Sequence, residues 1–251
     1  MLLIFDLGAG LREPWRILFM FTHFTSVMTW GIWILTLFLP ICFLYALIEI
    51  MHVHPGLLAW LRKGLRFLPE TLPYRRIKRV VCSIGIVLAV GTAIYTGVLL
   101  SVVQAIPFWN TPILPILFLV SAVSTGMGLT IDLSATLAVP TVQRRFKYLP
   151  VIHIVFIGLE AALLGLLLWT SLSQGGEAAE SARWVLTGPG ALLFWVMIGG
   201  FGLLYPLMVH SYALARHSHG YISGILSGAG IVIAGVFVRY LIIAAAVPVS
   251  I

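Results

Sequence analysis

The chain has 251 residues, of which 61% are hydrophobic and only 9% are charged, and its formal net charge is +7. A soluble domain carries about a quarter charged residues, so this composition excludes an ordinary water-soluble enzyme and favours a surface that faces lipid. Apolar runs of about 20 residues recur along the chain, whereas the strands of a membrane β-barrel would alternate apolar and polar residues. The sequence therefore predicts membrane-spanning helices, since a span must pair its own backbone groups.

The predicted elements fall into a short first segment and one long bundle. The first apolar run ends at Asp6, too short to cross a bilayer, so 1–22 is expected to be an outward-facing interfacial segment. The remainder, 23–251, predicts an all-α polytopic bundle with six transmembrane helices, at about 25–50, 80–103, 112–139, 151–172, 188–210 and 221–247. Gly220, Gly224 and Gly228 recur four residues apart, a spacing that lets helices approach closely.

The basic residues predict the orientation of this bundle. Most of them fall in the loops after the first, third and fifth predicted helices: Arg62, Lys63, Arg66, Arg75, Arg76, Lys78, Arg79, Arg144, Arg145, Lys147 and Arg216. Because basic loops stay on the cytoplasmic side, both termini and the other two loops are expected outside. The positive charge then reflects anionic lipid rather than nucleic acid.

The two cysteines constrain any redox role. Cys42 and Cys82 both fall inside predicted helices, and two thiolates cannot hold an iron–sulfur cluster that needs four ligands. The sequence contains no Cys-x-x-Cys motif, phosphate loop or dinucleotide-binding glycine motif. If the protein handles electrons, most metal centres are expected on partner subunits.

Four polar residues inside the predicted spans are candidates for function. Asp132, His153, Glu160 and Arg239 each cost several kcal/mol near the bilayer centre, so each needs a partner or a water-filled cavity. His153 and Glu160 are about two helical turns apart and share a helix face. Two interpretations stay open: these residues are structural ion pairs, or they form a proton or water path.

A second candidate group lies near the expected outer surface. Tyr95 precedes by about two turns an uncharged loop that contains Pro107, Phe108, Trp109 and Asn110. Aromatic residues at this depth often form only an interfacial belt. A tyrosine hydroxyl inside an apolar bundle nevertheless needs a hydrogen-bond partner, and a quinone carbonyl is a candidate.

Several motifs resemble one membrane-protein family. The segments are Gly91-Thr-Ala-Ile-Tyr95-Thr-Gly97, Pro107-Phe-Trp-Asn110-Thr-Pro-Ile-Leu-Pro115 and Ser124-Thr-Gly126, flanked by Asp6-Leu7-Gly8 and by Thr25-Ser-Val-Met-Thr-Trp-Gly31. Together they closely resemble the NrfD-type membrane subunits, a family that includes the polysulfide reductase anchor. The resemblance covers nearly the whole chain, and the Pro-Phe-Trp-Asn block is its most specific part.

The resemblance implies a respiratory role in the cytoplasmic membrane of a bacterium or archaeon. Such subunits have eight helices, of which this chain resembles the last six, and they carry no haem and no covalently bound cofactor. They exchange electrons with quinone or menaquinone near the outer face. Their partners are a four-cluster iron–sulfur subunit and a molybdopterin catalytic subunit, so those cofactors are expected only there.

The resemblance also assigns residues. Tyr95 becomes the candidate quinone ligand, and Asp6 becomes a candidate charge near that pocket. Pro107, Phe108, Trp109 and Asn110 are expected to dock the iron–sulfur partner, because an uncharged aromatic loop is typical of an interface core. One departure is that no residue matches the quinone-pocket residue of the family's first helix. Three explanations stay open: the start of the chain is misplaced, a further partner chain supplies the two other helices, or the site is altered.

Two other functions remain alternatives. A b-type cytochrome needs two histidines at matching depth on facing helices, and His153 and His210 both lie near the inner end. A secondary transporter would move a substrate without any redox partner. Visible haem absorption or substrate flux would distinguish these from a quinone-reactive subunit.

Overall fold

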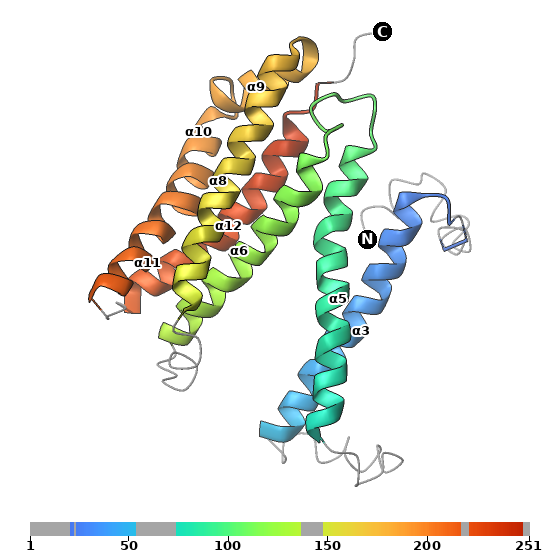
Figure 1. Ribbon diagram of the computed structural model, residues 1–251, viewed down its shortest axis with the longest axis vertical. Coiled ribbons are helices and arrows are strands. Elements are labelled where there is room, and N and C mark those ends of the chain that lie inside the picture. Colours follow the sequence, from blue (N-terminus) through green and yellow to red (C-terminus); the bar gives the residue numbers. More distant parts are fainter. Residues whose placement is uncertain (1–20, 23, 54–73, 137–147, 217–220, 248–251) are drawn as a thin grey trace. The chain divides into compact units, whose positions relative to one another are not determined.

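The computed structural model describes residues 21, 22, 24–53, 74–136, 148–216 and 221–247, and every regular element among them is a helix (Figure 1). Six stretches of these helices are long and apolar enough to cross a membrane. The prediction of an all-α polytopic bundle is therefore confirmed. The protein forms two compact units, residues 1–96 and 97–251.

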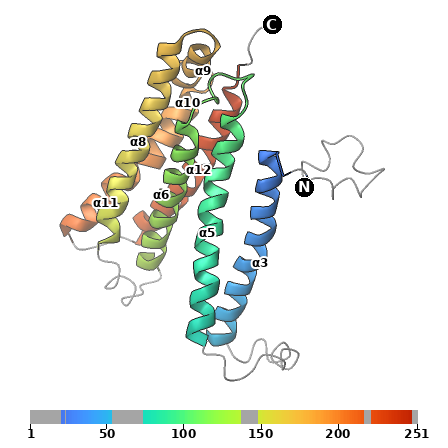
Figure 2. The same ribbon diagram turned by 45° about the vertical axis from the view of Figure 1, so that its right-hand side comes forward.

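Two long helices dominate the first unit. Helix α3 covers Val27–Val53, and helix α5 covers Tyr74–Ser101, so that only its last turn belongs to the second unit (Figure 2). At the end that carries the basic residues, Lys78 Nζ lies 2.6 Å from Glu49 Oε2 and 5.8 Å from the centre of the Tyr45 ring. A charge pair and a cation–π contact thus hold this end of the two helices together.

The second unit is built around α12, residues Tyr221–Ala244. Helix α12 packs against α6 (Ile113–Thr136) and against the π-helical segment η1 (Phe194–Leu204), while α6 also packs on α8 (Leu149–Gln174). Helix α11, Tyr205–Arg216, contacts both α8 and α12. The core side chains come mainly from α6, α8 and α12: Leu114, Leu117, Phe118, Leu164, Leu167, Val238 and Leu241.

The connection after α8 is itself helical. Gly175 and Gly176 have φ angles of 74° and 55°, which favour glycine, and they reverse the chain into α9, Gly176–Leu186. Ala178, Ala182 and Val185 form the buried face of α9 against the bundle. The sequence pattern indicated only a loop here, because a helix of three turns is too short and too polar to read as a span.

The fifth span contains an unusual turn. It runs through α10 (Ala191–Leu193), η1 and α11 without a break. The π-helical segment includes Gly202, where a methyl group would lie 2.5 Å from the Ala234 side chain, so the glycine lets η1 approach α12 closely. Wide π-helical turns are rare and often accompany functional sites.

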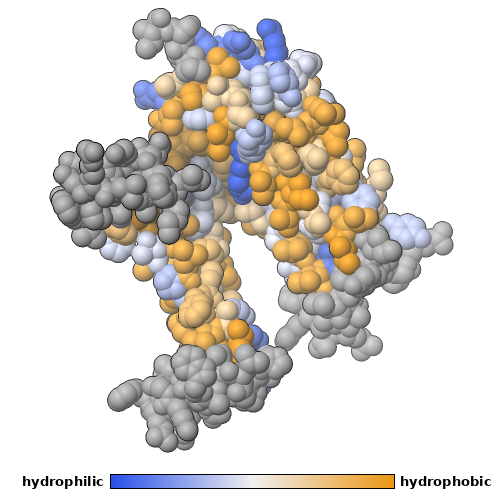
Figure 3. Space-filling view, turned by 180° about the vertical axis from the view of Figure 1, so that it is seen from behind, coloured by the Kyte–Doolittle hydropathy of each residue, from blue (hydrophilic) through white to orange (hydrophobic). Residues whose placement is uncertain are grey.

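Apolar side chains cover the sides of the described helices (Figure 3). Phe43, Val87, Trp169 and Leu192 are each at least 70% exposed. Such exposure suits contact with lipid, because hydrocarbon tails form no hydrogen bonds with side chains. The chain is a multi-pass membrane protein.

Candidate functional site

Tyr95 lies against the opposite helix of the first unit. Its ring is partly buried and covers the backbone of Gly31 on α3, where any side-chain methyl group would overlap three ring carbons. Among the residues that the structure describes, none forms a hydrogen bond with the Tyr95 hydroxyl. Glycine at position 31 therefore sets the place of the Tyr95 ring.

Asp6, the other residue predicted for the quinone pocket, lies outside the described residues. Its position near Tyr95 stays a prediction. The same holds for the interfacial segment 1–22, of which only residues 21 and 22 are described.

The uncharged loop before α6 is held by its own aromatic residues. Phe108 is only 2% exposed and packs in the core of the second unit. The indole Nε1 of Trp109 donates to the carbonyl oxygen of Ile242 at 2.7 Å. Asn110 is exposed, and Pro107 is partly exposed.

The docking role predicted for this loop stays a prediction, and the two aromatic rings differ in exposure. The loop turns back over the end of the bundle through hydrogen bonds from the Trp109 and Asn110 amides to the Ile106 carbonyl, and this turn directs the Phe108 ring inward. Phe108 is thus an anchor of the loop. Any docking surface on this loop consists of Pro107, Asn110 and the open side of Trp109.

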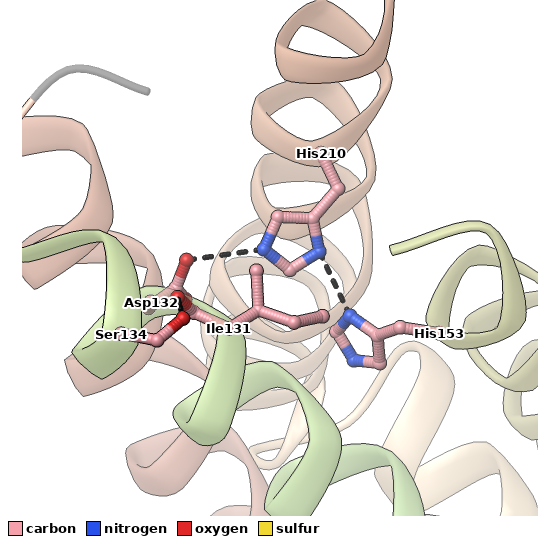
Figure 4. A network of polar contacts seen from close by, with 5 residues as sticks. All are labelled: Ile131, Asp132, Ser134, His153 and His210. Atoms are coloured by element: carbon pink, nitrogen blue, oxygen red, sulfur yellow. Dashed lines mark hydrogen bonds and ion pairs between the residues drawn. The ribbon is translucent and has the colours of Figure 1, made fainter. Parts of the chain in front are cut away.

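Three buried polar residues from three helices form a continuous series of contacts (Figure 4). His210 Nε2 of α11 lies 3.1 Å from Asp132 Oδ1 of α6, and His210 Nδ1 lies 2.8 Å from His153 Nδ1 of α8. Asp132 is 1% exposed, and the two histidines are fully buried. These three residues are called the buried triad below.

The far side of the His153 ring faces α6. A methyl group at Gly128 would lie 2.8 Å from His153 Cε1 and 3.1 Å from Nε2, so the glycine makes room for the imidazole. The ring also lies beside the backbone of Ser124, one helical turn from Gly128. His153 Nε2 has no partner of ordinary hydrogen-bond geometry among the described residues.

Glu160 and Arg239 form a second polar group, two turns along α8 from His153. Glu160 is 8% exposed and lies beside the hydroxyls of Ser121 and Ser124, with Arg239 as its charged neighbour. Arg239 Nη1 donates to the carbonyl oxygen of Gly235 at 2.8 Å, and its guanidinium carbon lies 5.2 Å from the centre of the Phe118 ring. Arg239 therefore has a carbonyl and an aromatic face in addition to the carboxylate charge.

A small cavity of about 10 Å³ adjoins Glu160. Ser124 and Thr125 of α6 line it, together with Ile198 and Gly202 of the π-helical segment. A space of this size with polar walls is large enough for about one water molecule. The wide turn of η1 thus lines the same small cavity as the buried carboxylate.

The four residues predicted from the sequence lie in two groups. Asp132 and His153 belong to the first and Glu160 and Arg239 to the second, and helix α8 contributes one residue to each. Sequence reasoning missed the central role of His210, which it considered only as a haem ligand opposite His153. In the structure the two Nδ1 atoms face each other directly at 2.8 Å rather than from opposite sides of a haem. The serines beside Glu160 were missed too, because a lone serine in an apolar helix usually bonds its own backbone.

No group of three His, Cys, Asp or Glu side chains arranged to hold a metal ion occurs in the described part of the protein. In the first group, the Asp132 carboxylate contacts the imidazole of His210, which contacts that of His153. In the second group, the Glu160 carboxylate lies beside two serine hydroxyls and the Arg239 guanidinium. Such contacts can hold protons and water.

Comparison with known proteins identifies the relatives of this protein. The family model for polysulphide reductase, NrfD, matches residues 1–249. The chain belongs to the NrfD polysulfide reductase family. It is 35% identical over 246 residues to the C subunit of the polysulfide reductase of Wolinella succinogenes, an alignment that covers 94% of this chain and 73% of that protein. It is 29% identical over 235 residues to protein NrfD of Escherichia coli, or 88% of this chain and 70% of that protein.

The NrfD-family motifs meet in pairs in the structure. Gly31 is the last residue of the Thr25–Gly31 segment, and it packs under the ring of Tyr95 from the Gly91–Gly97 segment. In the second unit, a methyl group at Gly97 would overlap the backbone of Pro115, so the ends of the Gly91–Gly97 and Pro107–Pro115 segments pack directly together. The motif glycines therefore serve close packing between segments that are apart in the sequence.

Proposed function

We propose that this NrfD-family membrane subunit exchanges electrons with a quinone or menaquinone bound at Tyr95. The observation that carries the proposal is the Tyr95 ring, which is fixed on Gly31 while its hydroxyl is unpaired among the described residues. A quinone offers an apolar ring and two carbonyl acceptors, which suit a phenol within an otherwise apolar helix pair.

The chemistry at this site divides between the subunit and its partners. A quinol that becomes a quinone releases two electrons and two protons. The Tyr95 hydroxyl donates a hydrogen bond to the quinone carbonyl and so orients the ring, while Asp6 is proposed as the nearby charged residue. The electrons pass to or from an iron–sulfur partner with four clusters, which connects to a molybdopterin catalytic subunit.

The name of the Wolinella relative, the C subunit of a polysulfide reductase, supports a role within a complex. The loop with Pro107, Trp109 and Asn110 is the proposed docking surface for the iron–sulfur partner, because it is uncharged and its backbone is fixed by Phe108. The basic ends of α5 and of the other helices are proposed to face the cytoplasm. Both termini then lie outside.

The buried charges are proposed to conduct protons in addition to pairing with each other. Glu160 has the two features that a proton path needs: a titratable carboxyl group among hydroxyls, and an adjoining cavity for about one water molecule. A structural ion pair alone requires only Arg239. Pure structural pairing also makes a different prediction for Glu160→Gln, because it expects a loss of assembly rather than a change in turnover.

The test of the quinone site is Tyr95→Phe in the assembled complex. Phenylalanine keeps the ring on Gly31 and removes only the hydroxyl. Loss of one neutral hydrogen bond costs about 1 kcal/mol, so the KM for quinol should rise about fivefold while assembly stays intact. The matched control is Tyr45→Phe, a tyrosine in the same helix pair whose ring contacts Lys78. Unchanged quinol kinetics in Tyr95→Phe would remove Tyr95 from the site.

A further inference from the structure

Each contact within the buried triad requires a hydrogen atom. The 2.8 Å contact between His153 Nδ1 and His210 Nδ1 needs one hydrogen between the two nitrogens, because two lone pairs or two N–H groups would repel. The 3.1 Å contact between His210 Nε2 and Asp132 Oδ1 likewise needs one hydrogen. With only these two hydrogens, the triad consists of one carboxylate and two neutral imidazoles, and its net charge is −1.

That two-hydrogen state is unfavourable in two respects. A net negative charge lies among apolar helices, at a site where all three residues are at most 1% exposed. His153 Nε2 also carries a bare lone pair, although it faces Gly128 and the backbone of α6 and has no partner among the described residues. A buried polar atom without a partner is destabilising, because it has lost its hydrogen bond to water.

A third hydrogen removes the net charge. Placed on His153 Nε2, it makes the triad neutral as a whole and turns the nitrogen into a donor on the side of the ring that lies beside the backbone of Ser124. The geometry points to the Asp132–His210–His153 triad as a binding site for a single proton, with His153 Nε2 as the atom where that proton enters and leaves.

Uptake and release of the proton need no other reactant. When a proton reaches His153 Nε2, the hydrogen on His153 Nδ1 moves across the 2.8 Å contact to His210 Nδ1. His210 is then an imidazolium next to the Asp132 carboxylate, and no covalent bond between heavy atoms changes. Release is the reverse sequence.

The position of the triad suits a proton path. Asp132 is four residues from the end of α6 at Thr136, and His153 is four residues from the start of α8 at Leu149, or about 6 Å by helical rise. In the described part of the second unit, the ionisable groups on the neighbouring turns of α8 and α12 include Glu160, on the same face of α8 as His153, and Arg239. Ser124 lies beside both the His153 ring and the Glu160 carboxyl group. The triad therefore deepens the proposed proton path, and it is independent of Tyr95.

The experiment measures proton binding directly. The full chain is placed in lipid nanodiscs, and infrared difference spectra are recorded as the pH is stepped between about 3 and 9, with histidine ring bands and carboxyl bands followed separately. Wild type should show one component, in which imidazole bands change while Asp132 stays a carboxylate. His153→Gln and His210→Gln should each lose that whole component, since an amide cannot take up the proton.

Two glycines of α6 provide a matched pair that leaves the triad itself intact. Gly128→Ala places a methyl group against the Ile231 side chain and the His153 ring, and should shift the midpoint of the component by about one pH unit or more. Gly126→Ala, which meets no atom within 4 Å, should leave it unchanged. His52→Gln, a histidine outside the triad, serves as the control for spectral background.

The proposal is overturned by any of three results: a folded His153→Gln variant that keeps the full component, a wild-type protein with no histidine titration in this range, or equal effects of the two glycine variants. Circular dichroism and thermal unfolding establish that each variant is folded. A normal proton component in a Tyr95→Phe complex with altered quinol kinetics would separate this site from the quinone site.

Discussion

At the scale of single residues, burial decides which polar groups can act. Glu160 is 8% exposed, yet it has hydroxyl neighbours, a water-sized cavity and a cationic neighbour. Arg239 has a carbonyl and an aromatic ring besides this carboxylate, so it is not left alone when the carboxylate is neutral. The surroundings of Glu160 thus tolerate a change of protonation.

Glu160→Gln should leave the complex assembled and slow proton-coupled quinol turnover, with a changed pH dependence. Glutamine preserves the volume and the contacts with the serine hydroxyls, but it cannot bind and release a proton. Complex yield and turnover across pH are the measurements. A fall in yield or thermal stability without any change in the pH profile of the remaining enzyme would favour the structural ion pair instead.

Phe108→Ala should destabilise the second unit. The ring is 2% exposed in the core, and its removal leaves a cavity that costs about 3 kcal/mol. The measurement is thermal unfolding of the purified protein. Asn110→Ala, an exposed neighbour in the same loop, is the control and should unfold at the wild-type temperature. A Phe108→Ala variant with unchanged unfolding would contradict the core position of the ring.

At the scale of elements, glycine positions determine how closely helices approach. Gly31 is covered by the Tyr95 ring, Gly202 by Ala234 and Gly128 by the His153 ring. The polar and aromatic side chains of both candidate sites therefore depend on backbone approach at a glycine on the neighbouring helix. The π-helical segment adds a further adjustment, because its wide turn contributes walls to the cavity beside Glu160.

Gly31→Ala should impair the quinone site by displacing Tyr95. The methyl group overlaps the ring, so the ring must move away from α3 and carry its hydroxyl with it. We expect a higher KM for quinol than in Tyr95→Phe, because both the hydroxyl and the ring are misplaced. The control is Gly85→Ala on α5, where a methyl group meets Ile41 at an ordinary 3.5 Å. Equal kinetics for Gly31→Ala and wild type would show that the ring position is immaterial.

At the scale of the whole molecule, lipid-facing surface and partner-facing surface have to be distinguished. Many large exposed side chains of the spans are apolar, whereas the loop with Pro107, Trp109 and Asn110 combines a fixed backbone with exposed groups and no charge. Fixed, uncharged loops at the end of a bundle suit a protein partner, because little conformational entropy is lost on docking.

Asn110→Arg should weaken the attachment of the iron–sulfur partner in washed membranes. A charge at the centre of an apolar contact must be desolvated without a counter-charge, which lowers affinity. The amount of partner retained is measured by quantitative immunoblotting against the amount of this subunit. Arg183→Glu on α9, a charge change outside this loop, is the control. Full retention of the partner by Asn110→Arg would place the docking surface elsewhere.

The sequence by itself determined the class of protein and the family. Composition and the length of the apolar runs require a helical membrane protein, because the bilayer accepts only segments that pair their own backbone groups. The motifs around Tyr95 and Asn110 were sufficient for the resemblance to the NrfD family, which the family comparison then confirmed. The buried charges were also recognisable, since any charge inside a span is costly.

Only the tertiary structure decided which of these residues meet. His210 joins Asp132 to His153 although 78 and 57 residues separate them along the sequence, and periodicity within one helix contains no information on such contacts. The inward direction of Phe108 depends on a turn of the loop, and the short helix α9 depends on burial of its alanine face against α8. Each of these features depends on packing and hydrogen bonding between segments that meet only after the helices have come together.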